Sequence, residues 1–239
     1  MRLDQALVVR KLVASRTLAQ KLIESGSVTV DGAVVTKTSR KTARAERLEV
    51  TQYSPFVSRG GEKLDFALDH FKIEVAGRDC LDVGASTGGF TDALLSRGAA
   101  RVFCVDSGSN QLHETLRNDP RVQFQERFNA RYMTSADLPF TPQIVVMDVS
   151  FISQTLLLEA LEAVLAREGI VISLIKPQFE LSPQELGKNG VVRDPKLHQK
   201  AVLRVQNRAK ELGFLWRGVV DSPIEGGEGN REFLCYLTR

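Results

Sequence analysis

Short apolar runs alternate with stretches of helical periodicity from residue 79 onward. The runs occupy residues 80–83, 101–105, 122–124, 143–147 and 169–175. Helical patterns lie between them at residues 89–97, 109–117, 130–136 and 153–166. This alternation predicts an α/β fold, in which a doubly wound parallel sheet carries helices on both faces. A longer helix over 196–212 precedes two strands at 214–221 and 232–238. The glycine-rich segment that joins these two strands predicts an antiparallel last strand.

The first fifty residues follow a different pattern. Apolar residues recur at helical spacing up to Leu12, and Ser15 is a suitable N-cap for a second helix that Gly26 ends. Residues 28–35 alternate like a β-hairpin that turns at Asp31-Gly32. The chain therefore begins with a small α+β unit that is separate from the large sheet.

Charge is distributed unevenly between these two parts. Residues 1–60 carry a net charge of +6, whereas the remaining residues carry −3. A basic front on a slightly acidic body indicates a module that binds a polyanion, although a merely solvated basic surface would look the same. The candidate RNA-binding residues are Arg2, Arg10, Lys11, Arg16, Lys21, Lys37, Arg40 and Lys41.

Several classes of function are disfavoured by composition. The three cysteines lie in apolar runs and the three histidines have no ligand-like spacing, so we expect neither a disulfide framework nor a metal site. The first residues, Met1-Arg2-Leu3-Asp4, lack the apolar stretch typical of a signal peptide, and no run reaches the ~20 apolar residues of a membrane span. We expect a cytoplasmic protein that has no membrane partner and needs no obligate protein partner.

Residues 81–90 read as a strand, a glycine turn and the start of a helix. Cofactors of doubly wound sheets bind at such a turn. A dinucleotide-binding turn needs glycine where this chain has Ser86. The observed glycines instead resemble the first motif of S-adenosylmethionine-dependent methyltransferases, with a tight strand–helix junction as the plain structural alternative. The candidate cofactor contacts are Asp82, Gly84, Ser86, Gly88, Gly89, Phe90, Asp106, Asn129 and Asp148.

Four charged residues lie where an α/β sheet would bring them to one pocket. Lys63 precedes the first strand of the sheet, Asp148 and Lys176 follow two buried strands, and Glu232 opens the last strand. Two ammonium groups and two carboxylates suit removal of a proton from a weakly acidic hydroxyl, such as a ribose 2′-hydroxyl. Two ordinary salt bridges are the structural alternative.

The order Lys, Asp, Lys, Glu resembles the catalytic tetrad of FtsJ-type ribose 2′-O-methyltransferases. The first fifty residues resemble the RNA-binding domain named after ribosomal protein S4, and the whole chain is similar to the TlyA family of haemolysin A proteins. The motifs that carry this resemblance are residues 58–64, 82–92, 147–153, 176–180 and 190–194.

The resemblance implies a class I methyltransferase sheet and an S-adenosylmethionine-dependent rRNA (cytidine-2′-O)-methyltransferase. It implies ribosomal RNA or a ribosomal subunit as the partner. The expected domains are an S4-like domain at residues 1–50, a linker at 51–60 and an FtsJ-like methyltransferase domain at 61–239.

Three questions stay open from the sequence. Lys176 can act as a base only when neutral, and its reference pKa is ~10.4, so it either takes the proton or stabilises the developing alkoxide. A catalytically silent RNA-binding or ribosome-assembly factor would have the same fold. Pore formation is disfavoured, because no amphipathic membrane helix or long apolar hairpin is evident.

Overall fold

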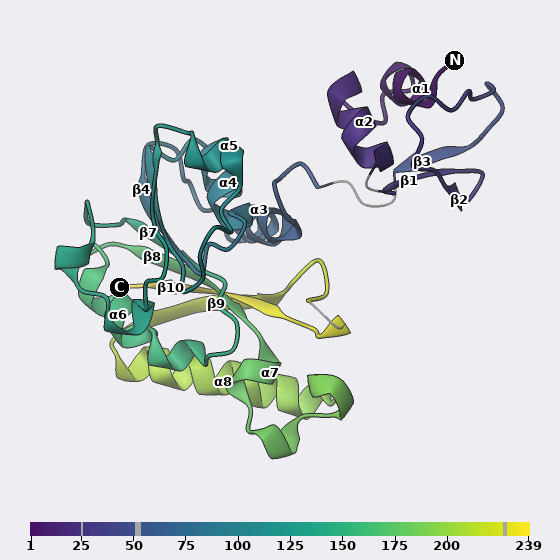
Figure 1. Cartoon of the computed structure of the whole chain (residues 1–239). Helices are drawn as coiled ribbons and strands as arrows, with labels where there is room; N and C mark the ends of the chain where they lie inside the picture. The colour runs from purple at the N-terminus through teal and green to yellow at the C-terminus, as the bar shows by residue number, and fades with distance from the viewer. Residues whose placement is uncertain (25, 51–53, 227–228) are drawn as a thin grey trace. The chain divides into compact units, whose positions relative to one another are not determined.

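The computed structural model describes residues 1–24, 26–50, 54–226 and 229–239, and only the backbone of Lys21 and Lys188. The chain forms two compact units, Met1–Pro55 and Phe56–Arg239, whose elements are labelled in Figure 1. The expected linker at 51–60 includes residues 51–53, which lie outside the described residues, and its last two residues begin helix α3.

The smaller unit packs two helices on a three-stranded antiparallel sheet. Its elements are α1 (Leu3–Val9), α2 (Arg16–Glu24), β1 (Val28–Val30), β2 (Ala33–Val34) and β3 (Leu48–Val50), and the strand order is β2-β1-β3. Ser15 caps α2 as expected, because its Oγ accepts a hydrogen bond from Leu18 N at 3.3 Å. Asp31 and Gly32 both have positive φ, 52° and 82°, which is the geometry of a tight hairpin turn. Strand β3 was not expected from the sequence.

The larger unit is built on a seven-stranded sheet. Its strands are β4 (Asp79–Val83), β5 (Arg101–Val105), β6 (Val122–Gln125), β7 (Ile144–Met147), β8 (Ile170–Ile175), β9 (Leu215–Asp221) and β10 (Phe233–Thr238). The order is β6-β5-β4-β7-β8-β10-β9. Strands β4 to β8 pair in parallel, and β10 is antiparallel to both of its neighbours. The expected doubly wound sheet with an antiparallel last strand is confirmed.

Helices cover both faces of this sheet (Figure 1). They are α3 (Arg59–Phe71), α4 (Gly89–Ser96), α5 (Glu114–Arg117), α6 (Leu158–Val164), α7 (Pro177–Glu180) and α8 (Pro195–Glu211), and the single 3₁₀ turns are η1 (Ala130–Tyr132), η2 (Ser135–Asp137), η3 (Gln154–Leu156), η4 (Pro183–Glu185) and η5 (Lys188–Gly190). Buried side chains of α3 and α4 form one apolar cluster, and those of α6 and α8 form a second on the opposite face. Each fully buried aliphatic side chain in these clusters contributes about 1.5–3 kcal/mol.

Two helical predictions need correction, and one helix was not predicted. The helix expected at 109–117 begins only at Glu114, because Asn110 has a left-handed φ of 57° that no helix accepts. The segment 130–136 forms two separate 3₁₀ turns instead of a helix. Helix α3 was not expected, although its burial of Leu64 and Leu68 makes it part of the core.

The direction of strand order reverses between β4 and β7. Loops that leave the carboxyl ends of two such strands diverge, and the crevice between them is where doubly wound sheets bind ligands. None of the helices among the described residues has the length and apolar character needed to span a bilayer.

Candidate active site

A glycine turn joins β4 to α4 at this reversal point. Gly84 and Gly88 have φ of 82° and 93°, and Ser86 between them has 48°. A Cβ on Gly84 would lie 2.6 Å from the backbone oxygen of Asp148, so only glycine lets the turn approach the end of β7 so closely. The turn forms one wall of a cavity of about 300 Å³. The other residues that line this cavity are Ser58, Arg59, Gly60, Lys63, Ala85, Thr87, Gly89, Phe90, Asp148, Ser150 and Lys176.

The carboxylate of Asp106 supports the turn from the end of β5. It accepts hydrogen bonds from Ser86 N and Gly108 N, both at 2.7 Å. Carboxylate oxygens have further lone pairs, so Asp106 can still accept from ribose hydroxyls. Asn129 caps η1 by accepting from Arg131 N at 3.1 Å, and its side-chain NH₂ makes no hydrogen bond within the described part of the chain.

These residues fit S-adenosylmethionine better than a phosphate-bearing cofactor. A dinucleotide-binding turn needs glycine where this turn has Ser86. S-adenosylmethionine has no phosphate for the turn to hold, and Asp106 can bond its ribose. No three His, Cys, Asp or Glu side chains gather as metal ligands among the residues the structure describes.

Asp82 lies beneath the turn and not in the cavity. Its side chain is fully buried, and Oδ2 accepts from Thr91 Oγ1 at 2.7 Å, which ties β4 to the first turn of α4. Burial raises the pKa of Asp82 to about 7, and the charge of Asp148 adds to this. Oδ1 has no hydrogen-bond partner among the described residues. This geometry supports an indirect task for Asp82, namely holding the glycine turn in place.

The four charged residues form two ion pairs. Lys63 Nζ donates to Glu232 Oε2 at 2.5 Å, and both side chains are almost completely buried. Lys176 Nζ lies 2.6 Å from Asp148 Oδ1 and donates to Ser150 Oγ at 2.9 Å. Lys63, Asp148 and Lys176 line the same cavity as the glycine turn. Buried charges of this kind are stable only when paired.

A second cavity, of about 340 Å³, adjoins the first at Ser150 and Lys176. Its lining includes Glu232 and two aromatic side chains, Phe151 and Phe179, whose ring centroids are 5.3 Å apart. Phe151 is 92% exposed and has a φ of 63°, an uncommon and strained conformation for a bulky residue. Sequence reasoning missed both aromatics, because nothing in a sequence shows that a phenylalanine is exposed.

A buried hydrogen-bond network connects the loops that carry Asp148 and Lys176. Glu180 on α7 accepts from Ser153 Oγ at 2.5 Å and from Gln154 N at 2.8 Å. Burial raises the pKa of this carboxyl. Glu180 therefore fixes the loop after β7 against the helix after β8, and sequence reasoning did not single it out.

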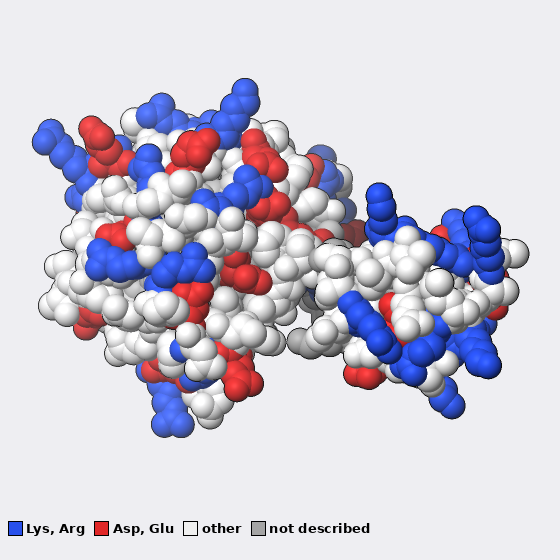
Figure 2. All heavy atoms as spheres, turned by 90° about the horizontal axis from the view of Figure 1, so that it is seen from above, with Lys and Arg blue, Asp and Glu red and all other residues white. Residues whose placement is uncertain are grey.

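The smaller unit carries its basic residues in two kinds of environment. Figure 2 shows Lys and Arg side chains gathered over this unit, whereas both signs of charge are mixed on the larger one. Lys11, Lys37 and Lys41 are exposed, and the side chain of Lys21 lies outside the described residues. Arg10 instead donates to the backbone oxygens of three residues, Ala43, Arg44 and Glu46. Arg40 lies 3.5 Å from Glu46, and Arg2 and Arg16 share the carboxylate of Asp4.

Comparison with known proteins adds the family. A family model described as FtsJ-like methyltransferase matches residues 56–239, and a model of the S4 domain matches residues 1–42. The 16S/23S rRNA (cytidine-2′-O)-methyltransferase TlyA of Mycobacterium tuberculosis is 46% identical over 238 residues, which cover 99% of this chain and 89% of that protein. Hemolysin A of Brachyspira hyodysenteriae is 40% identical, with 99% of each chain covered.

A solved structure agrees with these relatives. It is described as a hemolysin from Streptococcus thermophilus, is 39% identical, and superposes with a TM-score of 0.79 over 100% of this chain and 88% of that one. The expected S4 and FtsJ-like resemblances are thereby confirmed, and S-adenosylmethionine is the cofactor that the methyltransferase family implies. The chain belongs to the TlyA family, in which an S4 domain precedes an FtsJ-like methyltransferase domain.

Proposed function

We propose that this protein transfers a methyl group from S-adenosylmethionine to the 2′-hydroxyl of a cytidine in ribosomal RNA. The observation that carries the proposal is the position of Lys176, on the wall that the glycine-turn cavity shares with the aromatic cavity. A methyl donor in the first cavity and a hydroxyl in the second would meet at this side chain. The relative named as a 16S/23S rRNA (cytidine-2′-O)-methyltransferase supports the choice of acceptor.

The cofactor would be held by the glycine turn and by Asp106, and it supplies a methyl group bound to a positively charged sulfur. Transfer to the 2′-hydroxyl would break the carbon–sulfur bond, form a carbon–oxygen bond and release the hydroxyl proton. In the Lys176–Asp148 ion pair, the ammonium is placed to stabilise the negative charge that develops on oxygen, and the carboxylate is the member that can accept the proton. The buried Lys63–Glu232 pair contributes to both cavities, because Lys63 lines the first and Glu232 lines the second.

Most of the rate enhancement in such a reaction comes from positioning. An oriented intramolecular arrangement is worth about 7–11 kcal/mol of barrier, which no single proton transfer matches. Ser150 fixes the Lys176 ammonium, and Glu180 fixes the loop that carries Asp148. The exposed ring of Phe151 can stack on the base of the acceptor nucleotide, since every base has a π-face.

The experiment is methyl transfer with labelled S-adenosylmethionine. The acceptors are 30S subunits, 50S subunits and deproteinised ribosomal RNA, all from a strain that lacks this modification. Label on a subunit supports the proposal and identifies the substrate. Cofactor binding without label on any acceptor would instead favour the silent RNA-binding factor.

A further inference from the structure

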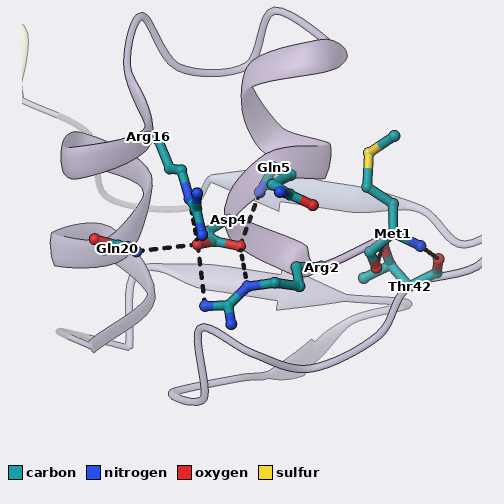
Figure 3. Close-up of polar contacts among 7 residues, drawn as sticks. All are labelled: Met1, Arg2, Asp4, Gln5, Arg16, Gln20 and Thr42. Carbon is teal, nitrogen blue, oxygen red and sulfur yellow. Dashed lines mark hydrogen bonds and ion pairs between the residues drawn. The ribbon is translucent and has the colours of Figure 1, made fainter.

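The fully buried carboxylate of Asp4 lies between two partly exposed arginines of the smaller unit, Arg2 and Arg16 (Figure 3). The side chain of Asp4 is 0% exposed, whereas the side chains of Arg2 and Arg16 are 41% and 52% exposed. Arg2 precedes α1 and Arg16 begins α2, so one acid joins two separate elements.

The carboxylate is saturated with donors. Arg2 approaches it with two nitrogens, Nε at 3.0 Å from Oδ1 and Nη2 at 3.2 Å from Oδ2. Arg16 Nε donates to Oδ2 at 2.8 Å, Gln20 Nε2 donates to the same oxygen at 3.0 Å, and Gln5 N donates to Oδ1 at 3.0 Å. The hydrogen bonds from Arg2, Arg16 and Gln20 hold the pKa of Asp4 well below its usual range, so it stays ionised.

Both guanidinium groups keep unused donors. Within the described part of the chain, Arg16 uses only Nε and Arg2 leaves Nη1 without a hydrogen bond. The exposed Lys41 is the antiparallel bridge partner of Arg2, which adds a further cation beside them. A planar guanidinium that is held at one edge presents its other edge in a fixed direction, and this geometry suits the oxygens of a phosphate.

We propose that Asp4 is a positioning residue for RNA: it holds Arg2 and Arg16 as a preformed fork for backbone phosphates. The proposal rests on the proposed function in that RNA is the ligand. The negative charge of Asp4 lowers the net positive charge of this surface by one. However, Asp4 already orders both arginine side chains, so they lose less side-chain freedom when RNA binds. If Asp4 acts by positioning the arginines, neutralising it should weaken RNA binding. If only net charge matters, neutralising it should strengthen RNA binding.

The test is binding of full-length variants to deproteinised ribosomal RNA at fixed salt. Asp4→Asn raises the net charge by one, as does Glu24→Gln, which removes an exposed acid of α2. We expect Asp4→Asn to weaken binding about five- to tenfold despite its added charge. Glu24→Gln should bind as tightly as the parent or slightly more tightly. Unchanged or tighter binding by a folded Asp4→Asn protein would overturn the proposal.

A second pair of variants decides the matter if Asp4→Asn fails to fold. Arg16→Lys keeps the charge but loses the fork, whereas Arg44→Lys makes the same change at an exposed arginine outside the cluster. Weaker binding by Arg16→Lys alone supports the proposal, and equal binding by both overturns it. Wild-type protein that fails to bind ribosomal RNA would instead overturn the proposed function, so the two failures are distinguishable.

Discussion

The candidate active site and the cluster around Asp4 use ion pairs in opposite ways. At the candidate active site both partners are largely buried, as in the Lys63–Glu232 pair with 10% and 2% of the side chains exposed. In the cluster of Asp4, Arg2 and Arg16 only the acid is buried, and the two arginines are about half exposed. Under the functions proposed above, the first arrangement would hold charges in the cavity where methyl transfer occurs, and the second would present charges to RNA.

The choice of cation follows the same difference. Lysine is a compact point charge that can exchange a proton, so it suits a cavity in which a hydroxyl must be deprotonated. Arginine stays charged and has a rigid fork of donors, so it suits recognition of phosphate. We therefore expect substitutions in the first region to affect rate and stability, and substitutions in the second to affect RNA affinity.

The largest effect is expected for Lys176→Met, which keeps the length of the side chain but removes its charge and proton chemistry. Methyl transfer should fall by about 10²- to 10⁴-fold in single-turnover assays. Binding of S-adenosylmethionine, measured by calorimetry, should change little. Lys210→Met on α8 is the matched control, and a Lys176→Met protein with near-normal turnover would show that this pair is only structural.

The second largest effect is expected when the buried Lys63–Glu232 pair is broken, and it is a loss of stability. Glu232→Gln leaves the Lys63 ammonium without its charge partner, and removal of one partner of a buried pair costs about 3–5 kcal/mol. Denaturant unfolding measures this loss. The double change Lys63→Met with Glu232→Gln should recover part of the stability without recovering methyl transfer. Recovery of both would contradict a role for the pair in the reaction.

The buried Asp82 should make stability depend on pH. Its folded pKa of about 7 lies above that of an unfolded aspartate near ~3.9, so the folded state holds an extra proton between these values. Stability contributed by this group is therefore present below about pH 4 and falls as pH rises toward 7, by up to about 4 kcal/mol. Asp82→Asn should remove this dependence of the unfolding free energy on pH. Asp69→Asn, which changes an exposed acid of α3, should leave the dependence between pH 5 and 7 unchanged. An unchanged slope in Asp82→Asn would refute the assignment.

The smallest effect is expected for Phe151, the exposed aromatic side chain of the second cavity. Phe151→Ala should reduce kcat/KM for the RNA substrate about tenfold, because loss of base stacking costs about 1–3 kcal/mol. Its melting temperature should stay near that of the parent, since the ring is exposed. Leu203→Ala, at another exposed apolar residue, controls for surface changes. A stability loss in place of the kinetic effect would assign Phe151 to packing.

Much of the fold was predictable because buried parallel strands are continuous apolar runs. The run at 169–175 became β8 at 170–175, and the two last strands differ from expectation by one residue at their starts. The failures are short or glycine-containing elements. Helix α3 begins with Arg59-Gly60-Gly61, which reads locally as a loop, and only packing of its apolar face makes it a helix.

The candidate site was less predictable, because partners are chosen by the fold. Lys63 and Glu232 are 169 positions apart, and no pattern indicates that they bond to each other and not to Asp148 or Lys176. Charge counts likewise treated Arg10 as an RNA ligand, whereas its guanidinium bonds to backbone oxygens of residues 43–46. A sequence shows which side chains carry chemistry, but burial and contacts decide where each one is used.

The most direct test of the central claim is the position of the transferred methyl group. RNA labelled by the wild-type enzyme would be digested to nucleosides and separated by chromatography coupled to mass spectrometry. The account predicts label on the ribose of cytidine, because the cavities join at a lysine–carboxylate pair suited to a hydroxyl. Label on a base would contradict it.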